Sequence, residues 1–290
     1  MTDLSRRSIL KTALSGFAAG SVMSGANRHS LDSVGVQLYT VRGILMKDPA
    51  AVLQSIAQIG YREAEVVWAS LQGIGPALKQ TPLRPVSVHL DSDLFKPENR
   101  EKMLSAIQTV KQFGFQYAVY PYVPVPERPA ALDGFKTLTD QLNKAGADCR
   151  EAGLQLCYHN HAFEFQPMES TTPFETMMRQ TDKKLVQLEM DVFWVSVAGH
   201  DPVALLKQYA GRVPLLHIKN KAAGFPVQFN EKVPAEAFRE AGNGSIDMKQ
   251  VLRAAADADT RHYFVEQDQT PGDPLDSLRQ SYRYLKQLKF

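Results

Sequence analysis

The chain has 290 residues, of which 44% are hydrophobic, and its 33 lysines and arginines nearly balance 31 aspartates and glutamates, giving a formal net charge of +2. This near-neutral balance argues against a general nucleic-acid or membrane surface. The apolar content suffices for one large core, and no linker rich in Pro, Gly or Ser divides the sequence, which favours a single domain.

The N-terminal stretch "SRRSILKTALSGFAAGSVMSGA" has the order of a twin-arginine export signal: a basic region at Arg6 and Arg7, an apolar region, and small residues at a cleavage site. A basic helix with frayed ends is the alternative. The apolar run is too short and too rich in Gly, Ser and Ala to be a stable membrane anchor. We therefore expect residues 1–26 to be a signal peptide for the twin-arginine export machinery, and residues 27–290 to be a mature periplasmic domain.

The cysteine content is low for a protein of an oxidising compartment. Cys149 and Cys157 are the two cysteines, one near the end of a helical pattern and one in a strand-like run. We expect two unpaired thiols and no disulfide framework.

Eight short apolar runs alternate with helical patterns along the rest of the chain. The strand-like runs cover residues 34–40, 62–68, 84–90, 116–122, 154–161, 185–192, 213–220 and 262–268. Between them lie helical patterns such as the one that ends at Gly60, and Asp201 and Asp247 stand at N-cap positions. Eight strands alternating with helices over about 250 residues predict an α/β fold, the closed (β/α)8 TIM barrel. An open doubly wound sheet is the alternative, but no glycine-rich loop follows the first strand.

Polar residues stand at the ends of nearly all these runs, where the active site of such a barrel lies. They are Gln37, Tyr39, Glu63, Glu65, His89, Tyr120, His159, His161, Glu164, Glu189, Asp191, His217, Lys219, Glu266 and Asp268. A single polar strand end is usually a satisfied rim group. Polar ends on nearly every strand are hard to explain by packing alone.

Four of these side chains are predicted to form a metal site. They are Glu164, Asp191, His217 and Glu266. Three carboxylates and one imidazole form an oxygen-rich set suited to Mn²⁺, Mg²⁺ or Co²⁺, with Zn²⁺ less favoured. A buried ion network with Lys219 and Arg62 is the alternative. The fourth ligand is left open, because His159 or His161 could take the place of Glu164.

The sequence resembles the xylose isomerase-like barrel superfamily from about Gly35 to the last helix. The motifs that carry this resemblance are "GVQLYTVR", "YHNHAFEF", "LEMDVFW", "LHIKNK", "GNGSID" and "FVEQD". The most similar group is the sugar phosphate isomerase/epimerase family, which is related to inosose dehydratase and ketose 3-epimerases. The resemblance implies a divalent metal held by Glu, Asp, His and Glu at the last four strands, and Asp191, His217 and Glu266 match three of them. Ketose 3-epimerases carry a Glu on the fifth strand where this chain has His159, which weakens the 3-epimerase interpretation.

The chemistry that the resemblance implies is proton removal next to a carbonyl. Glu266, His161 and His159 are the expected bases, and Lys219 is expected to hold an oxyanion. The residues expected to bind substrate are His89, Gln37, Tyr39, Glu65, Tyr120, Trp194 and Asp268. Mn²⁺ is the expected cofactor, with Mg²⁺, Co²⁺ or Zn²⁺ as alternatives.

We therefore expect a metal-dependent isomerase or epimerase that acts on a non-phosphorylated sugar or keto-sugar. No arginine cluster is present to hold a phosphate, and Asp247 after "GNGS" would discourage an anion. One alternative is a lyase or hydratase that cleaves 3-keto-glycosides by elimination, and another is a non-catalytic periplasmic sugar-binding barrel. The expected partners are a sugar or glycoside and the export machinery, with no nucleic acid; a homo-oligomer is left open.

Overall fold

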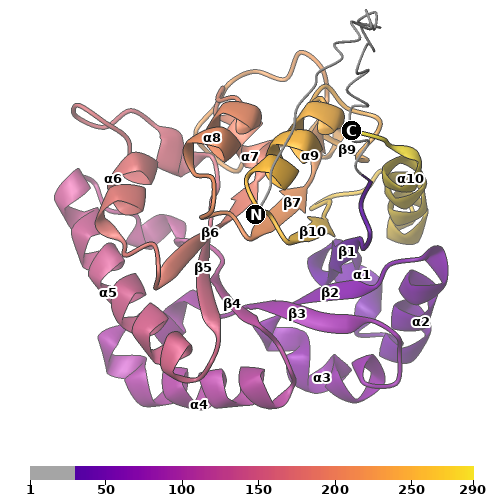
Figure 1. Cartoon of the computed structure of the whole chain (residues 1–290), viewed down its shortest axis with the longest axis horizontal. Helices are drawn as coiled ribbons and strands as arrows, with labels where there is room; N and C mark the ends of the chain where they lie inside the picture. The colour runs from indigo at the N-terminus through magenta and orange to yellow at the C-terminus, as the bar shows by residue number, and fades with distance from the viewer. Residues whose placement is uncertain (1–29) are drawn as a thin grey trace, which may run out of the picture.

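The computed structural model describes residues 30–290, so the predicted signal peptide and the domain boundary after residue 26 lie outside the described part of the chain. Eight parallel strands close a barrel in the order β1-β10-β7-β6-β5-β4-β3-β2 (Figure 1). They are β1 (Gly35–Gln37), β2 (Glu63–Val67), β3 (Arg84–His89), β4 (Tyr117–Tyr120), β5 (Gln155–His159), β6 (Val186–Asp191), β7 (Leu215–Ile218) and β10 (His262–Val265). All eight lie within the predicted strand-like runs, and the TIM-barrel prediction is confirmed.

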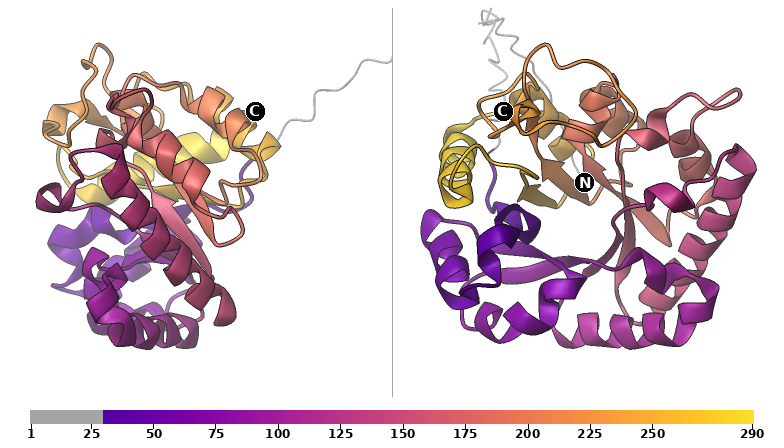
Figure 2. Two further views of the ribbon diagram at one scale, coloured as in Figure 1. Left: turned by 90° about the vertical axis from the view of Figure 1, so that its left-hand side faces the viewer. Right: turned by 180° about the vertical axis from the view of Figure 1, so that it is seen from behind.

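Helices surround the strands on the outside of the barrel, as the views from the front and from behind show (Figures 1 and 2). The α-helices are α1 (Arg42–Leu45), α2 (Pro49–Ile59), α3 (Trp68–Leu78), α4 (Arg100–Gln112), α5 (Leu132–Glu151), α6 (Pro173–Gln180), α7 (Val192–Val197), α8 (Pro202–Gln208), α9 (Met248–Asp257) and α10 (Pro274–Gln287). The predicted caps are confirmed: the side chains of Asp201 and Asp247 accept first-turn N–H groups, and Gly60 ends α2 with a φ of 126°.

Side chains of each barrel strand alternate between the barrel interior and the helix layer. Cys157, Leu215 and Phe264 belong to a small buried cluster that is separate from the main core between strands and helices. His159, His217 and Glu266 follow them by two residues and therefore point to the same interior. The polar strand ends thus form the layer of the barrel above an apolar interior.

A two-stranded antiparallel ribbon, which the sequence pattern did not predict, lies between β7 and α9. Its strands are β8 (Asn220–Lys221) and β9 (Phe238–Arg239). The buried Asn220 side chain donates to Ala241 O at 2.7 Å and accepts the N–H of Ile246 at 3.0 Å. A Cβ atom on Gly244 would lie 2.1 Å from Asn220 Oδ1. The "GNGSID" motif is therefore a structural element that returns the chain to α9.

Both cysteines are buried and unpaired, as expected: Cys149 lies in α5 and Cys157 in β5. Burial raises the pKa of the Cys149 thiol to about 12. Within residues 30–290, no helix combines the length and the apolarity needed to cross a membrane.

Candidate metal centre and substrate cavity

Four buried side chains converge at the C-terminal end of the barrel with potential ligand atoms within 4.8 Å of one another. They are His159, Asp191, His217 and Glu266, which come from β5, β6, β7 and the end of β10. His217 Nδ1 lies 2.9 Å from Glu266 Oε2 and 3.7 Å from Asp191 Oδ2. His159 Nε2 lies 3.5 Å from Asp191 Oδ2. This group contains three of the four expected ligands.

The hydrogen bonding of the group fits a bound cation. His159 Nδ1 lies 3.1 Å from the carbonyl oxygen of Pro121, which can only accept, so Nδ1 carries a proton and Nε2 of the neutral ring keeps its lone pair. This Nε2 is buried without a hydrogen-bond partner, and Asp191 Oδ2, which is also buried, has Lys219 Nζ at 3.0 Å as its ion-pair partner. Buried polar atoms are rarely left unpaired, and a metal-ligating histidine usually donates its other ring N–H to a carbonyl or carboxylate. The group could therefore hold a metal ion, and its carboxylates also take part in the ion network with Lys219 that the sequence analysis gave as the alternative.

Asp191 is fixed in place by the residue between the two histidines of "HNH". Asn160 Oδ1 accepts the N–H of Asp191 at 3.0 Å, and its Nδ2 donates to Asp191 O at 3.3 Å. One carboxylate oxygen of Asp191 caps α7 by accepting the N–H groups of Phe193 and Trp194 at 2.8 and 3.1 Å. The other oxygen is left to face His159 and His217.

Glu164, the first choice for the fourth ligand, lies outside this group, whereas His159, one of the two alternatives left open, lies within it. It belongs to the 3₁₀ helix Phe163–Phe165, where it accepts the Tyr158 hydroxyl at 2.7 Å and the N–H of His161 at 2.9 and 3.0 Å. Burial raises the pKa of Glu164 to about 8, although these hydrogen bonds act in the opposite direction. Glu164 holds the turn that carries His161, and His159 is the imidazole that faces Asp191.

The exchange of a carboxylate for an imidazole changes the metal preference of the set. Two imidazoles and two carboxylates form a softer donor set than the three carboxylates and one imidazole that the sequence predicted. Imidazole ligands suit Zn²⁺ and Fe²⁺, whereas all-oxygen sets suit Mg²⁺. The site therefore fits Zn²⁺ better than the prediction allowed, and Mg²⁺ less well.

Lys219 is a buried cation between three carboxylates beside this group. Its Nζ lies 2.6 Å from Glu266 Oε2, 2.6 Å from Asp268 Oδ1 and 3.0 Å from Asp191 Oδ2. Burial alone would lower the pKa of Lys219, but the three negative charges outweigh it and raise that pKa well above its usual value. Burial would likewise raise the pKa of Glu266, but the charges of Lys219 and His217 hold it below its usual range.

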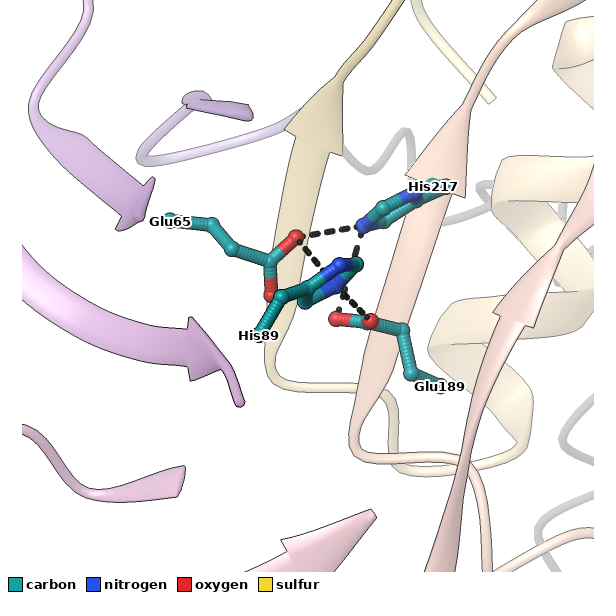
Figure 3. Close-up of side chains that lie close together, drawn as sticks. All are labelled: Glu65, His89, Glu189 and His217. Carbon is teal, nitrogen blue, oxygen red and sulfur yellow. Dashed lines mark hydrogen bonds and ion pairs between the residues drawn. The ribbon is translucent and has the colours of Figure 1, made fainter. Parts of the chain in front are cut away.

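A second layer of ionisable side chains lies beneath the first and shares His217 with it. Its members are Glu65, His89, Glu189 and His217, and the four side chains point toward one another (Figure 3). His217 Nε2 lies 2.5 Å from Glu65 Oε1, and His89 Nε2 lies 2.7 Å from Glu189 Oε2. Burial alone would lower the pKa of His89, but Glu65 and Glu189 raise it to about 10.

A cavity of about 770 Å³ opens above the two layers, and this volume is in the range of small-molecule sites. Eight residues expected in the site line it: Tyr39, His89, His159, His161, Trp194, Lys219, Glu266 and Asp268.

The imidazole of His161 makes no hydrogen bond within residues 30–290, and its Nδ1 is buried. Its ring centroid lies 4.8 Å from that of His159 and 5.3 Å from that of Trp194. Burial, followed by the charges of His159 and Lys219, holds the pKa of His161 well below its usual value.

Three residues expected to bind substrate do not reach the cavity. Gln37 and Glu65 lie in the layer beneath it, where Gln37 Nε2 donates to Glu65 Oε1 at 2.9 Å. Tyr120 points into the helix layer, where its ring packs edge-on against Phe95 at 4.7 Å. Glu63, another polar residue of the same strand as Glu65, lies at the opposite end of the barrel and pairs with His262 at 2.9 Å.

Several cavity residues were not predicted from the sequence because they lie outside the eight barrel strands, where no barrel-strand pattern indicates direction. They include Arg42, Asp91, Tyr122, Glu231, Val233, Phe238 and Gln269. Arg42 Nη2 donates to Asp268 O at 2.7 Å, which connects the loop after β1 to the loop after β10. Arg128 pairs with Glu231 at 2.9 Å, which connects the loop after β4 to the segment between β8 and β9.

Comparisons with known proteins agree with this architecture. The family described as "Xylose isomerase-like TIM barrel" matches residues 53–288. An inosose dehydratase of Clostridium perfringens is 29% identical over 163 residues, which cover 53% of this chain and 54% of the relative. The chain thus spans about half the length of the curated relatives it matches.

Two solved structures share the fold. A sugar phosphate isomerase/epimerase of Parabacteroides distasonis superposes with a TM-score of 0.71 at 23% identity, covering 92% of this chain and 97% of that one. The IolI protein, solved with a zinc atom, superposes with a TM-score of 0.67 at 16% identity, covering 87% and 96%. At these identities the likeness concerns the fold.

Proposed function

The chain belongs to the xylose isomerase-like TIM-barrel family, and we propose that it is a divalent-metal-dependent enzyme that removes a proton next to the carbonyl of a neutral sugar. The observation that carries this proposal is the shared cavity. The unpaired His161 imidazole lines the same cavity as His159, whose Nε2 lies 3.5 Å from Asp191 Oδ2. A base and a candidate metal group therefore face the same bound molecule.

The residues of the cavity have distinct roles in this proposal. A divalent ion held by His159, Asp191, His217 and Glu266 would supply Lewis-acid polarisation of a substrate oxygen. The His161 imidazole accepts the proton from the neighbouring carbon, and Lys219, whose N–H groups face Asp191, Glu266 and Asp268, supplies positive charge beside the oxygen on which negative charge develops. Trp194 and Phe238 supply apolar surface for the face of the sugar ring.

We propose that proton removal leads to elimination, as in a dehydratase or lyase. Epimerisation by two bases needs a second proton acceptor on the opposite face of the substrate. Among the cavity residues that the sequence predicted as bases or substrate contacts, Glu266 and Asp268 are engaged with Lys219, and His89 is engaged with Glu189, whereas His161 is unpaired. The similarity to an inosose dehydratase supports the same choice. Isomerisation or epimerisation, which begins with the same proton removal, is the second candidate.

The charge of the cavity supports a substrate without phosphate. The acidic residues that line it are Asp91, Asp93, Glu127, Glu231, Glu266 and Asp268. The basic residues of the lining are Arg42 and Lys219, and Lys219 is already neutralised by three carboxylates. Asp93 and Glu127 are paired with Lys96, and Glu231 with Arg128. Because three carboxylates share the single charge of Lys219, an excess of negative charge remains there, which disfavours an anionic substrate. The twin-arginine pattern at Arg6 and Arg7 supports action in the periplasm, where sugar phosphates are scarce.

Deuterium exchange tests the proposal whichever product the enzyme forms. The Zn²⁺- or Mn²⁺-loaded protein is incubated in D₂O with inososes, keto-sugars and 3-keto-glycosides, and loss of the proton next to the carbonyl is followed by NMR. We expect exchange that His161→Gln slows by about a hundredfold or more, because a positioned base contributes that much to the rate. The control His200→Gln, an exposed histidine outside the cavity lining, should exchange at the parental rate.

The same spectra distinguish the candidates. An unsaturated product identifies elimination, and an epimer or isomer identifies the second candidate. Bound sugar without exchange in the metal-loaded parent would contradict the proposal and favour the non-catalytic sugar-binding barrel.

A further inference from the structure

The layer beneath the candidate metal group has no direct role in the proposed function. We propose that Glu65 is a positioning residue that keeps the proton of His217 on Nε2, so that Nδ1 presents its lone pair to the metal. This inference rests on the proposed metal site. It assigns a function to β1, β2 and β3, which carry Gln37, Glu65 and Ser87 but none of the four candidate ligands.

The two ring nitrogens of His217 face different layers. Nε2 lies 2.5 Å from Glu65 Oε1, below, and Nδ1 lies 2.9 Å from Glu266 Oε2 in the upper group. His217 and Glu65 are both fully buried, so no solvent competes for either nitrogen. A neutral imidazole carries one proton, and the partner of one nitrogen decides whether the other nitrogen is a donor or a ligand. A carboxylate at Nε2 therefore selects Nδ1 as the ligand.

Glu65 is itself held as an acceptor. Gln37 Nε2 donates to its Oε1 at 2.9 Å, and the Ser87 hydroxyl donates to its Oε2. With His217 Nε2 and with His89 Nε2, which lies 3.2 Å from Oε1, four groups converge on this one carboxylate from β1, β3 and β7. The arrangement fixes both the position and the orientation of the group that receives the His217 proton.

The lower layer also has the composition of a metal site, with two imidazoles and two carboxylates, and Glu189 Oε1 is buried there without a hydrogen-bond partner. Two observations favour a proton over a second ion. Glu65 is already surrounded by N–H and O–H donors. A single neutral imidazole, His217, also cannot bind an ion in each layer, because one nitrogen keeps the proton.

Zinc titration of the purified chain tests the inference. The number of ions bound and the dissociation constant are measured by competition with a chromophoric chelator for the parent and for Glu65→Gln. The amide keeps the size of the side chain but can present N–H to Nε2, which stabilises the tautomer with the proton on Nδ1. We expect one ion per chain in the parent and an affinity about 10- to 100-fold weaker in Glu65→Gln.

Glu63→Gln is the matched control. Glu63 lies on the same strand and pairs with His262 at 2.9 Å, but at the opposite end of the barrel. Its substitution should leave the zinc affinity unchanged. Should Glu65→Gln fail to fold by circular dichroism, ¹⁵N-histidine NMR of the zinc-loaded parent decides, because the inference requires His217 protonated at Nε2.

Three results would overturn the inference, and they are distinguishable. Equal zinc affinity in Glu65→Gln and the parent, or His217 protonated at Nδ1 in the loaded parent, would remove the role of Glu65 while leaving the metal site intact. Two ions in the parent and one in Glu65→Gln would identify the lower layer as a second ligand set. No bound ion in the parent would overturn the proposed function together with the inference.

Discussion

Glu164 is a carboxylate close to the candidate metal group that serves the scaffold. It accepts hydrogen bonds from the Tyr158 hydroxyl and the His161 N–H, and Glu164 itself does not line the cavity. The turn it holds carries His161 from the end of β5 into the cavity wall. Three neighbouring residues have separate roles: His159 is a candidate metal ligand, Asn160 holds the Asp191 backbone, and His161 is the proposed base.

The pH dependence of stability tests this role of Glu164. Its pKa is raised from 4.5 to about 8 in the folded protein, so between these values the folded state binds a proton that the unfolded state has released. The free energy of unfolding therefore falls as pH rises through this window and levels off above it. The change is on the order of a few kcal/mol, at about 1.4 kcal/mol per unit of pKa.

Urea unfolding of the metal-free parent and of Glu164→Gln between these pH values measures the effect. The unfolding free energy of the parent minus that of Glu164→Gln should fall steadily as pH rises, because the parent loses stability through Glu164 and the amide does not titrate. A difference that is constant with pH would show that Glu164 is ionised in the folded protein at neutral pH.

The sequence located residues of the candidate metal group where a residue stands at the end of a strand and its side chain also points into the barrel. Asp191, His217 and Glu266 end predicted strands on the inward face, and the structure brings them together. The alternation of side chains along β4 places Tyr120 outside the barrel interior, because its neighbour Val119 points inward. Glu164 follows the strand by several residues, so its direction depends on a turn that no periodic pattern describes.

At the scale of elements, the ribbon of β8 and β9 depends on close packing between Asn220 and Gly244. The side-chain amide of Asn220 is buried and its donors and acceptor are used, so it cannot move aside for an added methyl group. The ribbon leads back to α9, which begins at the Asp247 cap. The segment between its strands also carries cavity residues, including Val233.

Gly244→Ala should therefore destabilise the protein by about 1–3 kcal/mol, the usual cost of overpacking. Chemical denaturation measures this change. Gly43→Ala in α1 is the control, because a Cβ there meets nothing within 4 Å, and alanine should be neutral or stabilising by up to about 1 kcal/mol. Equal stability of the two variants would contradict the structural role assigned to "GNGSID".

The eight barrel strands were predictable because each is a continuous apolar run bounded by helical patterns. The ribbon was not, because its strands have two residues each and are held by one asparagine side chain. A single side-chain contact of this kind produces no periodic hydrophobic pattern in the local sequence.

At the scale of the whole molecule, the barrel divides into ligand strands and supporting strands. β5, β6, β7 and β10 provide the four candidate ligands, and β1, β2 and β3 provide residues of the layer beneath them. The closed barrel and its polar mouth were predictable from the count of strands. The position of Gln37 and Glu65 below the cavity was not predictable, because the register between neighbouring strands is not encoded in the pattern of either strand.

A group of buried ligands assembled by folding couples metal binding to global stability. Ions that bind the folded chain alone should raise its free energy of unfolding by about 2.7 kcal/mol when free metal is a hundred times the dissociation constant. Urea unfolding with Zn²⁺ and with a chelator measures this gain. Asp191→Ala should show none, and an equal gain in that variant would place the metal elsewhere.

The most direct test of the account is the metal content of purified protein after reloading with Zn²⁺ or Mn²⁺, compared among the parent, His159→Ala and Glu164→Gln. We predict one divalent ion in the parent, its loss in His159→Ala and its retention in Glu164→Gln. A parent without metal, or loss of the ion in Glu164→Gln with retention in His159→Ala, would contradict the metal centre described here.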